Sequence, residues 1–342
     1  MGVMRVIKPG PLTTLQDLGR TGYQQFGVPV NGVMDSDAHR RANALVGNAP
    51  DAATLECTLQ GPVLRFDRDT LIALTGGDLD ARVDDLSVPR DCAVLLRAGV
   101  TLHFGARRTG ARAYVAVSGG FDVPTIMGSR STFVRAGYGG FEGRALQRDD
   151  RVPTATPAVP YRGLTRLMVQ AGVPFAAAPV VPWPMADAAP DEGRADANAT
   201  LRVVAGPQWQ AFTPTSQTAF AELGYRIDSR SDRMGYRLAG EPLALAAPLE
   251  MISEGTPFGT VQVPPDGQPI VLMADRQTAG GYPKIAYVAS VDLPHLAQAM
   301  PEDVVRFQVV SLGHAQHLAQ QRAADLTRFT AAAAATLESI AH

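Results

Sequence analysis

Lysine is nearly absent from this sequence. Of its 342 residues, 31 are lysine or arginine, and only Lys8 and Lys284 are lysines. A P-loop needs a lysine after the pattern G-x-x-x-x-G, and neither lysine stands in that motif. Biotin is normally attached to a lysine between methionines, and neither lysine has such neighbours. These observations exclude a Walker-type nucleotide loop and predict that this chain carries no covalent biotin.

Cysteines, long apolar runs and clustered positive charge are also scarce. The 2 cysteines, Cys57 and Cys92, stand in apolar surroundings, so we expect buried thiols rather than a disulfide framework or a nucleophile. No stretch reaches the roughly 18 apolar residues that cross a bilayer, and no apolar leader follows Arg5 and Lys8. The net charge of −2, with dispersed arginines, does not suit a phosphate backbone. We expect a cytoplasmic protein that binds neither nucleic acid nor membrane.

What the sequence does contain is typical of a mainly β protein. Hydrophobic residues make up 46% and charged residues 19%, which indicates a folded chain. Short β-branched or aliphatic runs alternate with Gly, Pro, Asp and Asn, as in barrels or sandwiches. The runs expected to be strands are residues 71–75, 93–97, 101–104, 113–117, 260–263, 270–274 and 285–289. Helices are expected over residues 35–46, capped by Asp35 or Ser36, and over the Ala-rich tail.

The length favours two domains. Residues 173–200 are rich in Pro and Ala without a sustained period, which predicts an exposed linker. We therefore expect an N-terminal domain over residues 1–172, a linker over 173–200, a C-terminal domain over 201–313 and a C-terminal helix over 314–342.

The same order of short motifs occurs in both halves of the sequence, which suggests that the two halves are related. Each half reads E-x-T-x-x-G, then an acidic residue at a strand end, then A-Y-V-A, then D-[VL]-P, beginning at Glu56 and at Glu254. Chance matching of degenerate strand sequence is the alternative. If the halves are duplicated, matching loops are expected near a shared cleft.

The densest polar cluster follows a strand at residues 275–284. Arg276 can grip a carboxylate or phosphate, Lys284 can stabilise developing negative charge, and Gly280 and Gly281 allow close backbone approach. Asp275 and Tyr282 belong to the same loop. Loops on a rigid scaffold are where binding groups accumulate, although an ordinary turn with an ion pair is the alternative.

Other polar residues add to this candidate site. Antiparallel pairing of the flanking strands would bring Glu254 toward Arg276, and Gln262 lies between them in the sequence. Asp232 and Arg233 supply an acidic and a cationic side chain for the site, or take part in a structural ion-pair network. Asp78 ends a strand in the first half, where it can accept a proton or occupy a plain turn. The residues thus indicate an anion-handling cleft built by two β domains, with no metal site.

Several familiar sites are missing. Residues 137–143 lack the G-x-G-x-x-G spacing of a dinucleotide fold, and no G-x-S-x-G elbow of an α/β-hydrolase occurs. His314 and His317 share a helix face but have no third metal ligand.

A set of ordered motifs resembles the KipA family. The family includes the C subunit of bacterial 5-oxoprolinase, proteins once named allophanate hydrolase subunit 2, and part of the urea carboxylase carboxyltransferase domain. The motifs are TLQDLGR at 14–20, VMD at 33–35, LTGGD at 74–78, GSRST at 128–132, GFEGRAL at 140–146, DRMGYR at 232–237 and the loop at 275–284. The likeness runs from about residue 4 to about 312. Thr278-Ala279 stands where the family commonly has a second Thr.

The resemblance implies a fold and a complex. The fold is a pair of cyclophilin-like β-barrel domains with a few short helices. The complex joins this chain to a KipI-like subunit and a lactam-utilisation-type subunit, and the reaction is ATP-dependent opening of 5-oxo-L-proline, a small anion, to L-glutamate. ATP with Mg is expected, bound by or shared with a partner subunit. Arg276 and Lys284 would stabilise the lactam oxygen, and Asp275, Glu254 or Asp78 would move protons.

Two alternatives remain open at this point. In the first, the chain is a carboxyltransferase component that works with a biotin protein supplied separately. In the second, it is a non-enzymatic protein that binds a KipI-like inhibitor.

Overall fold

The computed structural model describes residues 2–183 and 198–341, so positions 184–197 of the predicted linker lie outside the described residues. The chain forms two compact units. Unit 1 comprises residues 1–20, 35–184 and 324–342, and unit 2 comprises residues 21–34 and 185–323. Among the described residues, every helix is too short or too polar to span a membrane.

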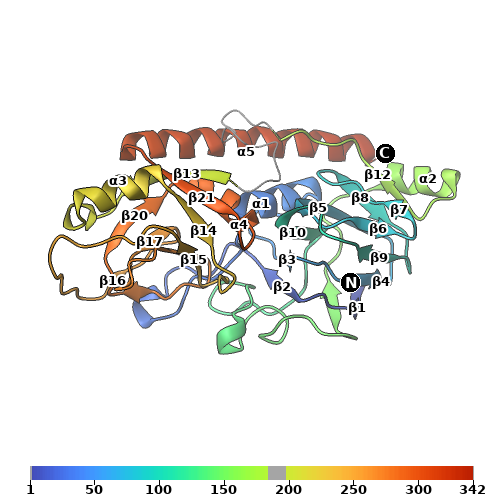
Figure 1. The fold of residues 1–342 in the computed structure, drawn as a ribbon. Helices are drawn as coiled ribbons and strands as arrows, with labels where there is room; N and C mark the ends of the chain where they lie inside the picture. The colour runs from blue at the N-terminus through green and yellow to red at the C-terminus, as the bar shows by residue number, and fades with distance from the viewer. Residues whose placement is uncertain (1, 184–197, 342) are drawn as a thin grey trace. The chain divides into compact units, whose positions relative to one another are not determined.

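Unit 1 contains two six-stranded sheets (Figure 1). In strand order, the first sheet is β11 (Arg151–Thr154), β1 (Gly2–Lys8), β4 (Val63–Phe66), β9 (Thr101–Phe104), β6 (Ala81–Val83) and β7 (Leu86–Ser87). The second is β12 (Phe175–Ala177), β8 (Ala93–Leu96), β5 (Thr70–Asp78), β10 (Thr109–Val117), β3 (Thr54–Thr58) and β2 (Leu12–Gln16). All pairings of named strands within the two sheets are antiparallel.

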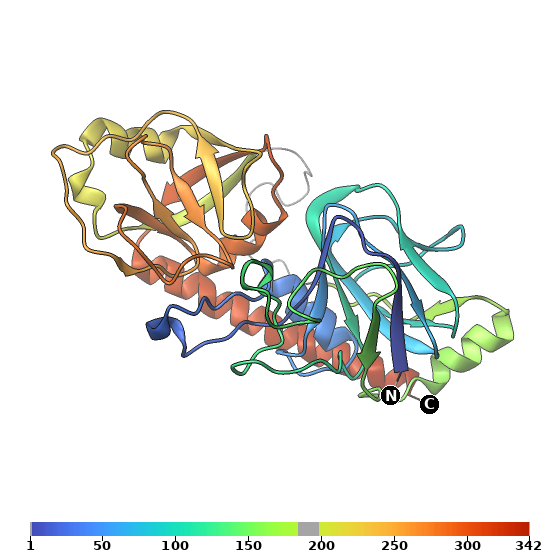
Figure 2. The same ribbon diagram turned by 90° about the horizontal axis from the view of Figure 1, so that it is seen from below.

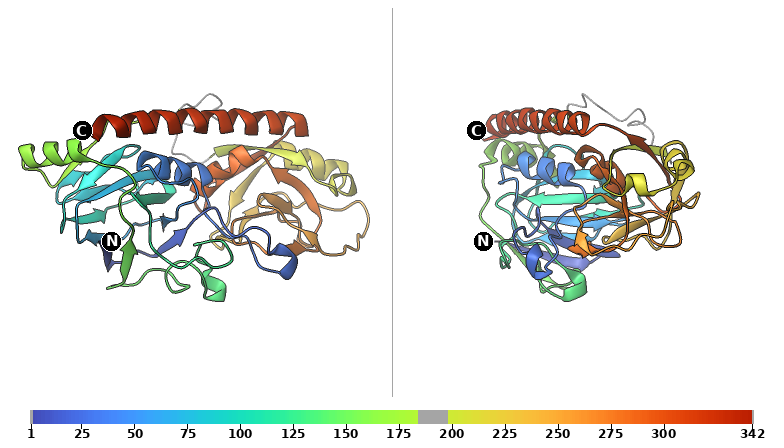
Figure 3. Two further views of the ribbon diagram at one scale, coloured as in Figure 1. Left: turned by 180° about the vertical axis from the view of Figure 1, so that it is seen from behind. Right: turned by 90° about the vertical axis from the view of Figure 1, so that its left-hand side faces the viewer.

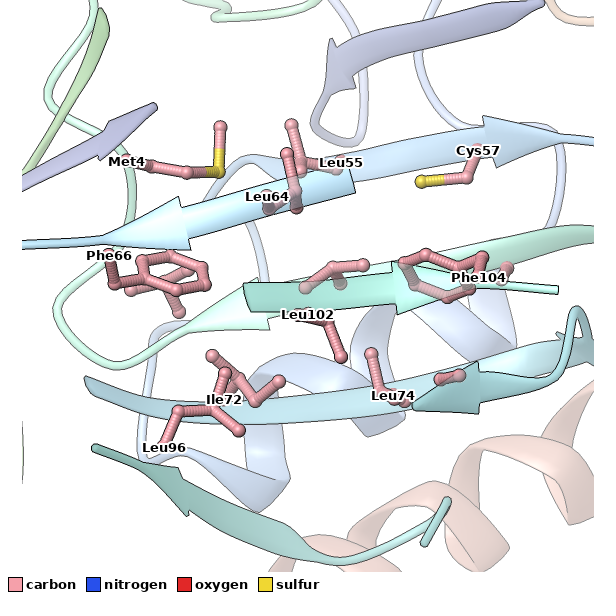
Figure 4. Close-up of a cluster of buried hydrophobic side chains, with 14 of the residues drawn as sticks. Met4, Leu55, Cys57, Leu64, Phe66, Ile72, Leu74, Leu96, Leu102 and Phe104 are labelled. Carbon is pink, nitrogen blue, oxygen red and sulfur yellow. The ribbon is translucent and has the colours of Figure 1, made fainter. Parts of the chain in front are cut away.

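The core of unit 1 lies between these sheets (Figure 4). Met4, Phe66 and Leu102 project from the first sheet, and Leu55 and Ile72 project from the second. These side chains are at most 1% exposed. Burying a side chain of this kind stabilises a fold by about 1.5–3 kcal/mol, so alternating inward residues hold the two sheets together.

Helix α1 (Ser36–Leu45) packs on β5 and β10. The Asp35 side chain accepts hydrogen bonds from the amides of Asp37 and Ala38, which confirms the predicted N-cap. Unit 1 also contains α2 (Arg162–Ala171), which is followed by β12. Because β12 pairs with β8, the first residues of the predicted linker belong to a sheet.

Unit 2 is a closed seven-stranded barrel (Figure 2). Its order is β13 (Asn198–Ala205), β20 (Lys284–Val288), β17 (Thr260–Gln262), β18 (Ile270–Leu272), β15 (Gly235–Ala239), β14 (Gly224–Ile227) and β21 (Val304–Val309). β21 closes the barrel by pairing with β13 in parallel. A separate two-stranded ribbon joins β16 (Glu254–Gly255) to β19 (Ala279–Gly280).

Helices complete unit 2. The stacked rings of Phe220 and Phe307, 4.4 Å apart, fix α3 (Pro214–Glu222) on the barrel. The other α-helices are α4 (Leu293–Gln298) and α5 (Leu312–Ile340), a single continuous helix in Figure 3. Residues of α5 up to 323 belong to unit 2 and the rest to unit 1. Short 3-10 helices are η1 (Gln24–Phe26), η2 (Val134–Ala136), η3 (Trp209–Ala211) and η4 (Ser290–Asp292).

The structure confirms a mainly β fold with a C-terminal helix, and each of the seven expected runs overlaps a strand. One barrel closes, in unit 2, whereas the strands of unit 1 form two sheets instead of one closed barrel. Residues 21–34 belong to unit 2, although they lie within the range expected for the N-terminal domain. Met34 joins the core of unit 2, so burial of its side chain helps to anchor this segment there.

The repeated motifs of the two halves occupy only partly equivalent positions in the structure. Both A-Y-V-A segments are strands, but their partners differ. Glu56 is the register partner of Tyr114, whereas the partner of Tyr287 on β17 is Thr260 rather than Glu254. Glu56 is buried and Glu254 is exposed on β16. The two glutamates therefore do not occupy equivalent positions.

Candidate functional site

Unit 2 contains a cavity of about 360 Å³. It is lined by the segment before α1, by β16 and the loop after it, and by the loop between β18 and β19. The lining residues are Gln24, Pro29, Val30, Gly255, Thr256, Pro257, Arg276, Gln277 and Thr278. All of them belong to unit 2, so the cavity is complete within that unit.

Thr256 holds the two walls of the cavity together. Its hydroxyl donates to the carbonyl of Gln277 at 2.6 Å, and its amide donates to the carbonyl of Thr278 at 3.1 Å. Its own carbonyl accepts from Nε of Arg276 at 2.8 Å. These bonds extend the β16–β19 ribbon and fix the backbone from which Arg276 and Gln277 project.

Arg276 is the charged residue in the cavity lining. Its Nε and Nη1 donate to the carbonyls of Thr256 and Met273, and its guanidinium lies 5.5 Å from the ring centre of Phe258. Among the described residues it forms no ion pair, and Nη2 has no hydrogen-bond acceptor. Burial lowers the pKa of Arg276 to about 10, with Asp275 acting in the opposite direction. A partly desolvated cation beside a cavity attracts an anionic ligand.

Asp275 is committed to a different set of contacts. Its carboxylate accepts from Nε of Arg233 at 2.9 Å and from Nη2 at 3.1 Å, and from the side-chain amide of Asn31 at 2.9 Å. Nη2 of Arg233 also donates to the carbonyl of Gly32. Both charged side chains are at most a tenth exposed. This buried network ties residues 31–32 to the barrel and places Gln24, Pro29 and Val30 at the cavity.

Lys284 and Glu254 form a pair next to the ribbon. The ammonium of Lys284 is fully buried and donates to Oε2 of Glu254 at 2.9 Å, while the glutamate side chain is 51% exposed. Antiparallel pairing of Glu254 with Gly280 confirms the strand arrangement expected from the sequence. The cation that meets Glu254 is Lys284 rather than Arg276.

Gln262 is buried on β17, at a register position opposite Lys284. Its Nε2 faces the carbonyl of Tyr282 at 3.5 Å, and its Oε1 faces Nε2 of Gln277 at 3.4 Å. A Cβ on Gly280 would come within 2.6 Å of Nε2 of Gln262, so the glycine leaves room for this amide. Gly281 and Tyr282 are exposed beyond the ribbon.

Two predicted site residues lie apart from this cluster. Asp232 is exposed, and its carboxylate accepts from the amides of Met234 and Gly235, which closes the turn before β15. Asp78 belongs to unit 1, where its carboxylate accepts from the amide of Asp80. The structure thus brings together Arg276, Lys284, Glu254, Asp275, Arg233, Gln262 and Gly280 within unit 2.

Sequence reasoning missed Asn31, Thr256 and Gln277 as members of the site. Gln277 lies inside the predicted loop, Asn31 lies two residues before the VMD motif, and Thr256 lies two residues after Glu254, so nearness to these features was the available signal. None of the three has a charge, and uncharged polar side chains are too common in turns to be singled out. Only the fold shows which amides meet Asp275 or the cavity.

The motifs of unit 1 also come together. The Asp17 carboxylate accepts hydrogen bonds from the hydroxyls of Ser129 and Ser131, each at 2.6 Å, and from the amides of Gly19 and Arg130. All of these donors belong to the same unit. This buried carboxylate joins the motifs at 14–20 and 128–132, and its hydrogen-bonding capacity is used internally.

The cysteines take no part in either cluster. Cys57 and Cys92 are buried and free, and burial raises the pKa of each thiol to about 12. Across residues 2–183 and 198–341, no three Cys, His, Asp or Glu side chains gather as a metal-binding group.

Comparison with known proteins extends over most of the chain. The family model described as "Carboxyltransferase domain, subdomain A and B" matches residues 26–309. The chain is 38% identical to the C subunit of 5-oxoprolinase from Escherichia coli, covering 92% of this chain and 93% of that protein. It is 39% identical to the C subunit of 5-oxoprolinase from Haemophilus influenzae, covering 89% and 90%.

A solved structure shares the fold. The crystal structure of the K. lactis urea amidolyase superposes with a TM-score of 0.83 and 29% identity over 96% of this chain. The chain spans 20% of that larger protein. The resemblance seen in the motifs is therefore confirmed, and the chain belongs to the carboxyltransferase domain family of subdomains A and B.

Proposed function

We propose that this chain is the C subunit of an ATP-dependent 5-oxoprolinase, which opens 5-oxo-L-proline to L-glutamate. The observation that carries the proposal is Arg276, a partly desolvated cation without a carboxylate partner among the described residues, in the wall of a cavity. The two bacterial relatives, each named as the C subunit of a 5-oxoprolinase, match almost the whole chain and are more similar to it than the urea amidolyase is. The carboxylate of 5-oxoproline would pair with the guanidinium.

The overall reaction consumes ATP and two water molecules and yields glutamate, ADP and phosphate. The lactam carbonyl is a poor electrophile, and transfer of the terminal phosphoryl group of ATP to its oxygen activates the carbonyl carbon for attack by water. The ring C–N bond then breaks and its nitrogen takes up a proton, and a second water releases phosphate from the resulting acyl phosphate. In this proposal, Glu254 moves protons during ring opening while Lys284 holds its carboxylate in place. Arg276 binds the substrate and opposes the negative charge that develops.

ATP and Mg are assigned to a site shared with partner subunits. A triphosphate needs several donors or cations, and Arg276 is the charged residue that lines the cavity. A magnesium ion bound through phosphates needs only one or two carboxylates, which a partner can supply. We propose as partners a KipI-like subunit and a lactam-utilisation-type subunit.

A biotin-dependent carboxyltransferase is the second candidate, favoured by the superposition on the K. lactis urea amidolyase. Lys284 is buried, so its amine is not presented for covalent attachment of biotin. In this second proposal, a separate protein would bring biotin to the site.

The test is co-purification with the products of neighbouring genes, followed by measurement of ATP hydrolysis with and without 5-oxoproline. We expect lactam-dependent turnover that Lys284→Met lowers by about 100-fold. Lys8→Met is the matched control, because Lys8 is the other lysine and is exposed on β1. Turnover that requires urea and a biotin protein instead would support the second candidate. Complex formation without turnover on any of these substrates would favour a binding protein.

A further inference from the structure

The Gln277 side chain is held in one orientation by its neighbours. The carbonyl of Tyr282 can only accept a hydrogen bond, so the nitrogen of the Gln262 amide must face it. The oxygen of Gln262 then faces Gln277, whose nitrogen must donate to it. Gln262 is 2% exposed, so this chain of amides starts from a buried and fixed point.

One edge of the Gln277 amide remains for a ligand. A primary amide has two N–H groups and a carbonyl oxygen, and Gln262 uses one of the N–H groups. Among the described residues, no protein group donates to Oε1 of Gln277. Gln277 also lines the cavity and directly follows Arg276 in the chain. The cavity wall therefore offers a donor and an acceptor side by side, next to a cation.

A lactam matches this edge better than an open-chain amide does. The ring forces the amide to be cis, so its N–H and C=O point to the same side and can pair with both groups of a carboxamide. An open-chain secondary amide is trans, and its cis form costs about 2.5 kcal/mol. It can meet only one of the two groups at a time.

We propose that Gln277 is a specificity-determining residue that recognises the cis-amide edge of the substrate by hydrogen bonds. Gln262 is its positioning residue, and Arg276 pairs with the substrate carboxylate. This inference rests on the proposed lactam substrate. Urea and the ureido ring of biotin present the same edge, so the chemistry recognised is a cis N–H and C=O pair.

The test measures binding to the full chain by calorimetry. The probes are 5-oxoproline, 2-pyrrolidinone as a neutral lactam, N-methylacetamide as a trans amide and cyclopentanecarboxylate as a carboxylate without an amide. Urea and biotin are measured as well, because they present the same cis edge as a lactam. We expect Gln277→Met to weaken binding of both lactams by about tenfold and to leave cyclopentanecarboxylate unchanged. The wild type should bind 2-pyrrolidinone more tightly than N-methylacetamide.

Two further variants sharpen the test. Gln308→Met makes the same change at an exposed position on β21, outside the cavity lining. It should leave lactam binding unchanged. Gln262→Leu should weaken lactam binding like Gln277→Met and spare cyclopentanecarboxylate, whereas a merely structural loss would weaken both. Thermal melting confirms that each variant is folded.

The outcomes separate this inference from the proposed function. Lactam binding that is insensitive to Gln277→Met, or equally sensitive to Gln308→Met, overturns the inference and leaves the function standing. Binding of urea or biotin, but not of lactams, in a Gln277-dependent manner supports the inference and overturns the function. If none of these compounds binds the chain, alone or with its co-purified partners, both are wrong.

Discussion

Two polar clusters, one in each unit, differ in how completely they are satisfied. In unit 1 the buried carboxylate of Asp17 accepts hydrogen bonds from two hydroxyls and two backbone amides. In unit 2 the Arg276 guanidinium donates to two carbonyls and retains a nitrogen without an acceptor among the described residues. A saturated group stabilises the fold, whereas an unsatisfied one beside a cavity is available to a ligand.

This difference separates motifs that look alike in the sequence. Both clusters combine charged side chains with glycine-containing turns. The Asp275–Arg233 pair shows that the distinction also holds within unit 2, because its charges meet each other and Asn31. Charge and turn residues mark both kinds of cluster, and only the number of internal partners distinguishes them.

The largest effect is expected from breaking the saturated cluster. Asp17→Ala leaves its four donors without their acceptor, and we expect the free energy of unfolding of unit 1 to fall by about 4 kcal/mol. Thermal and urea denaturation followed by circular dichroism measure this loss. Asp51→Ala is the control, since Asp51 is exposed in the same unit and should change stability by less than about 0.5 kcal/mol. Equal effects for the two variants would contradict the structural role of Asp17.

Acid should destabilise unit 1 through His39. Burial lowers the pKa of this imidazole from 6.5 to about 4, against a smaller opposing influence of Asp17. The unfolded state therefore binds the extra proton first, and stability falls as the pH drops from 6.5 toward 4. Once His39 is protonated in both the folded and the unfolded state, the free energy of unfolding has fallen by about 3 kcal/mol.

The measurement is the thermal midpoint of wild type and His39→Gln between pH 7 and pH 4. The variant should lose the part of the pH dependence that His39 contributes, although it is less stable at neutral pH. His314→Gln, at an exposed position, should retain the wild-type profile. Parallel profiles for wild type and His39→Gln would contradict the prediction.

Removing the unsatisfied cation should impair binding rather than folding. Arg276→Met is expected to weaken 5-oxoproline binding by about 100-fold. Its thermal midpoint should change little, because the lost hydrogen bonds and the lost desolvation cost offset each other. Calorimetry and thermal melting test the two statements separately. Arg237→Met, on an exposed face of β15, is the matched control. A large drop in the melting midpoint without loss of binding would show that Arg276, like Asp17, stabilises the fold rather than binds a ligand.

Raising the pH should weaken carboxylate binding through the same cation, and this is the smallest of the expected effects. Because the pKa of Arg276 is lowered to about 10, the guanidinium is charged below that pH and neutral above it. Affinity for a carboxylate should be constant up to about pH 9 and fall roughly tenfold between pH 9 and pH 11. Binding of neutral 2-pyrrolidinone serves as the reference. A carboxylate affinity that stays flat through pH 11 would contradict either the lowered pKa of Arg276 or its contact with the anion.

The sequence by itself located seven of the strands, the first helix and the region of the candidate site. Alternating apolar runs and turn residues locate β5, β8 and β9, and the Asp35 cap begins α1, because these signals act between neighbours in the chain. The loop at 275–284 was found because charge and glycine are concentrated there. Family motifs spread over both halves indicated the relatives that the comparisons then showed.

Only the tertiary structure decided which polar groups are satisfied. It assigned residues 21–34 to unit 2 and paired Lys284 with Glu254. It brought Asn31 into hydrogen-bonding contact with Asp275, more than 200 residues away in the sequence. It also left Nη2 of Arg276 and one edge of Gln277 without internal partners among the described residues. Hydrogen bonds and desolvation depend on distances between atoms that are remote in the chain, so no local pattern could have predicted them.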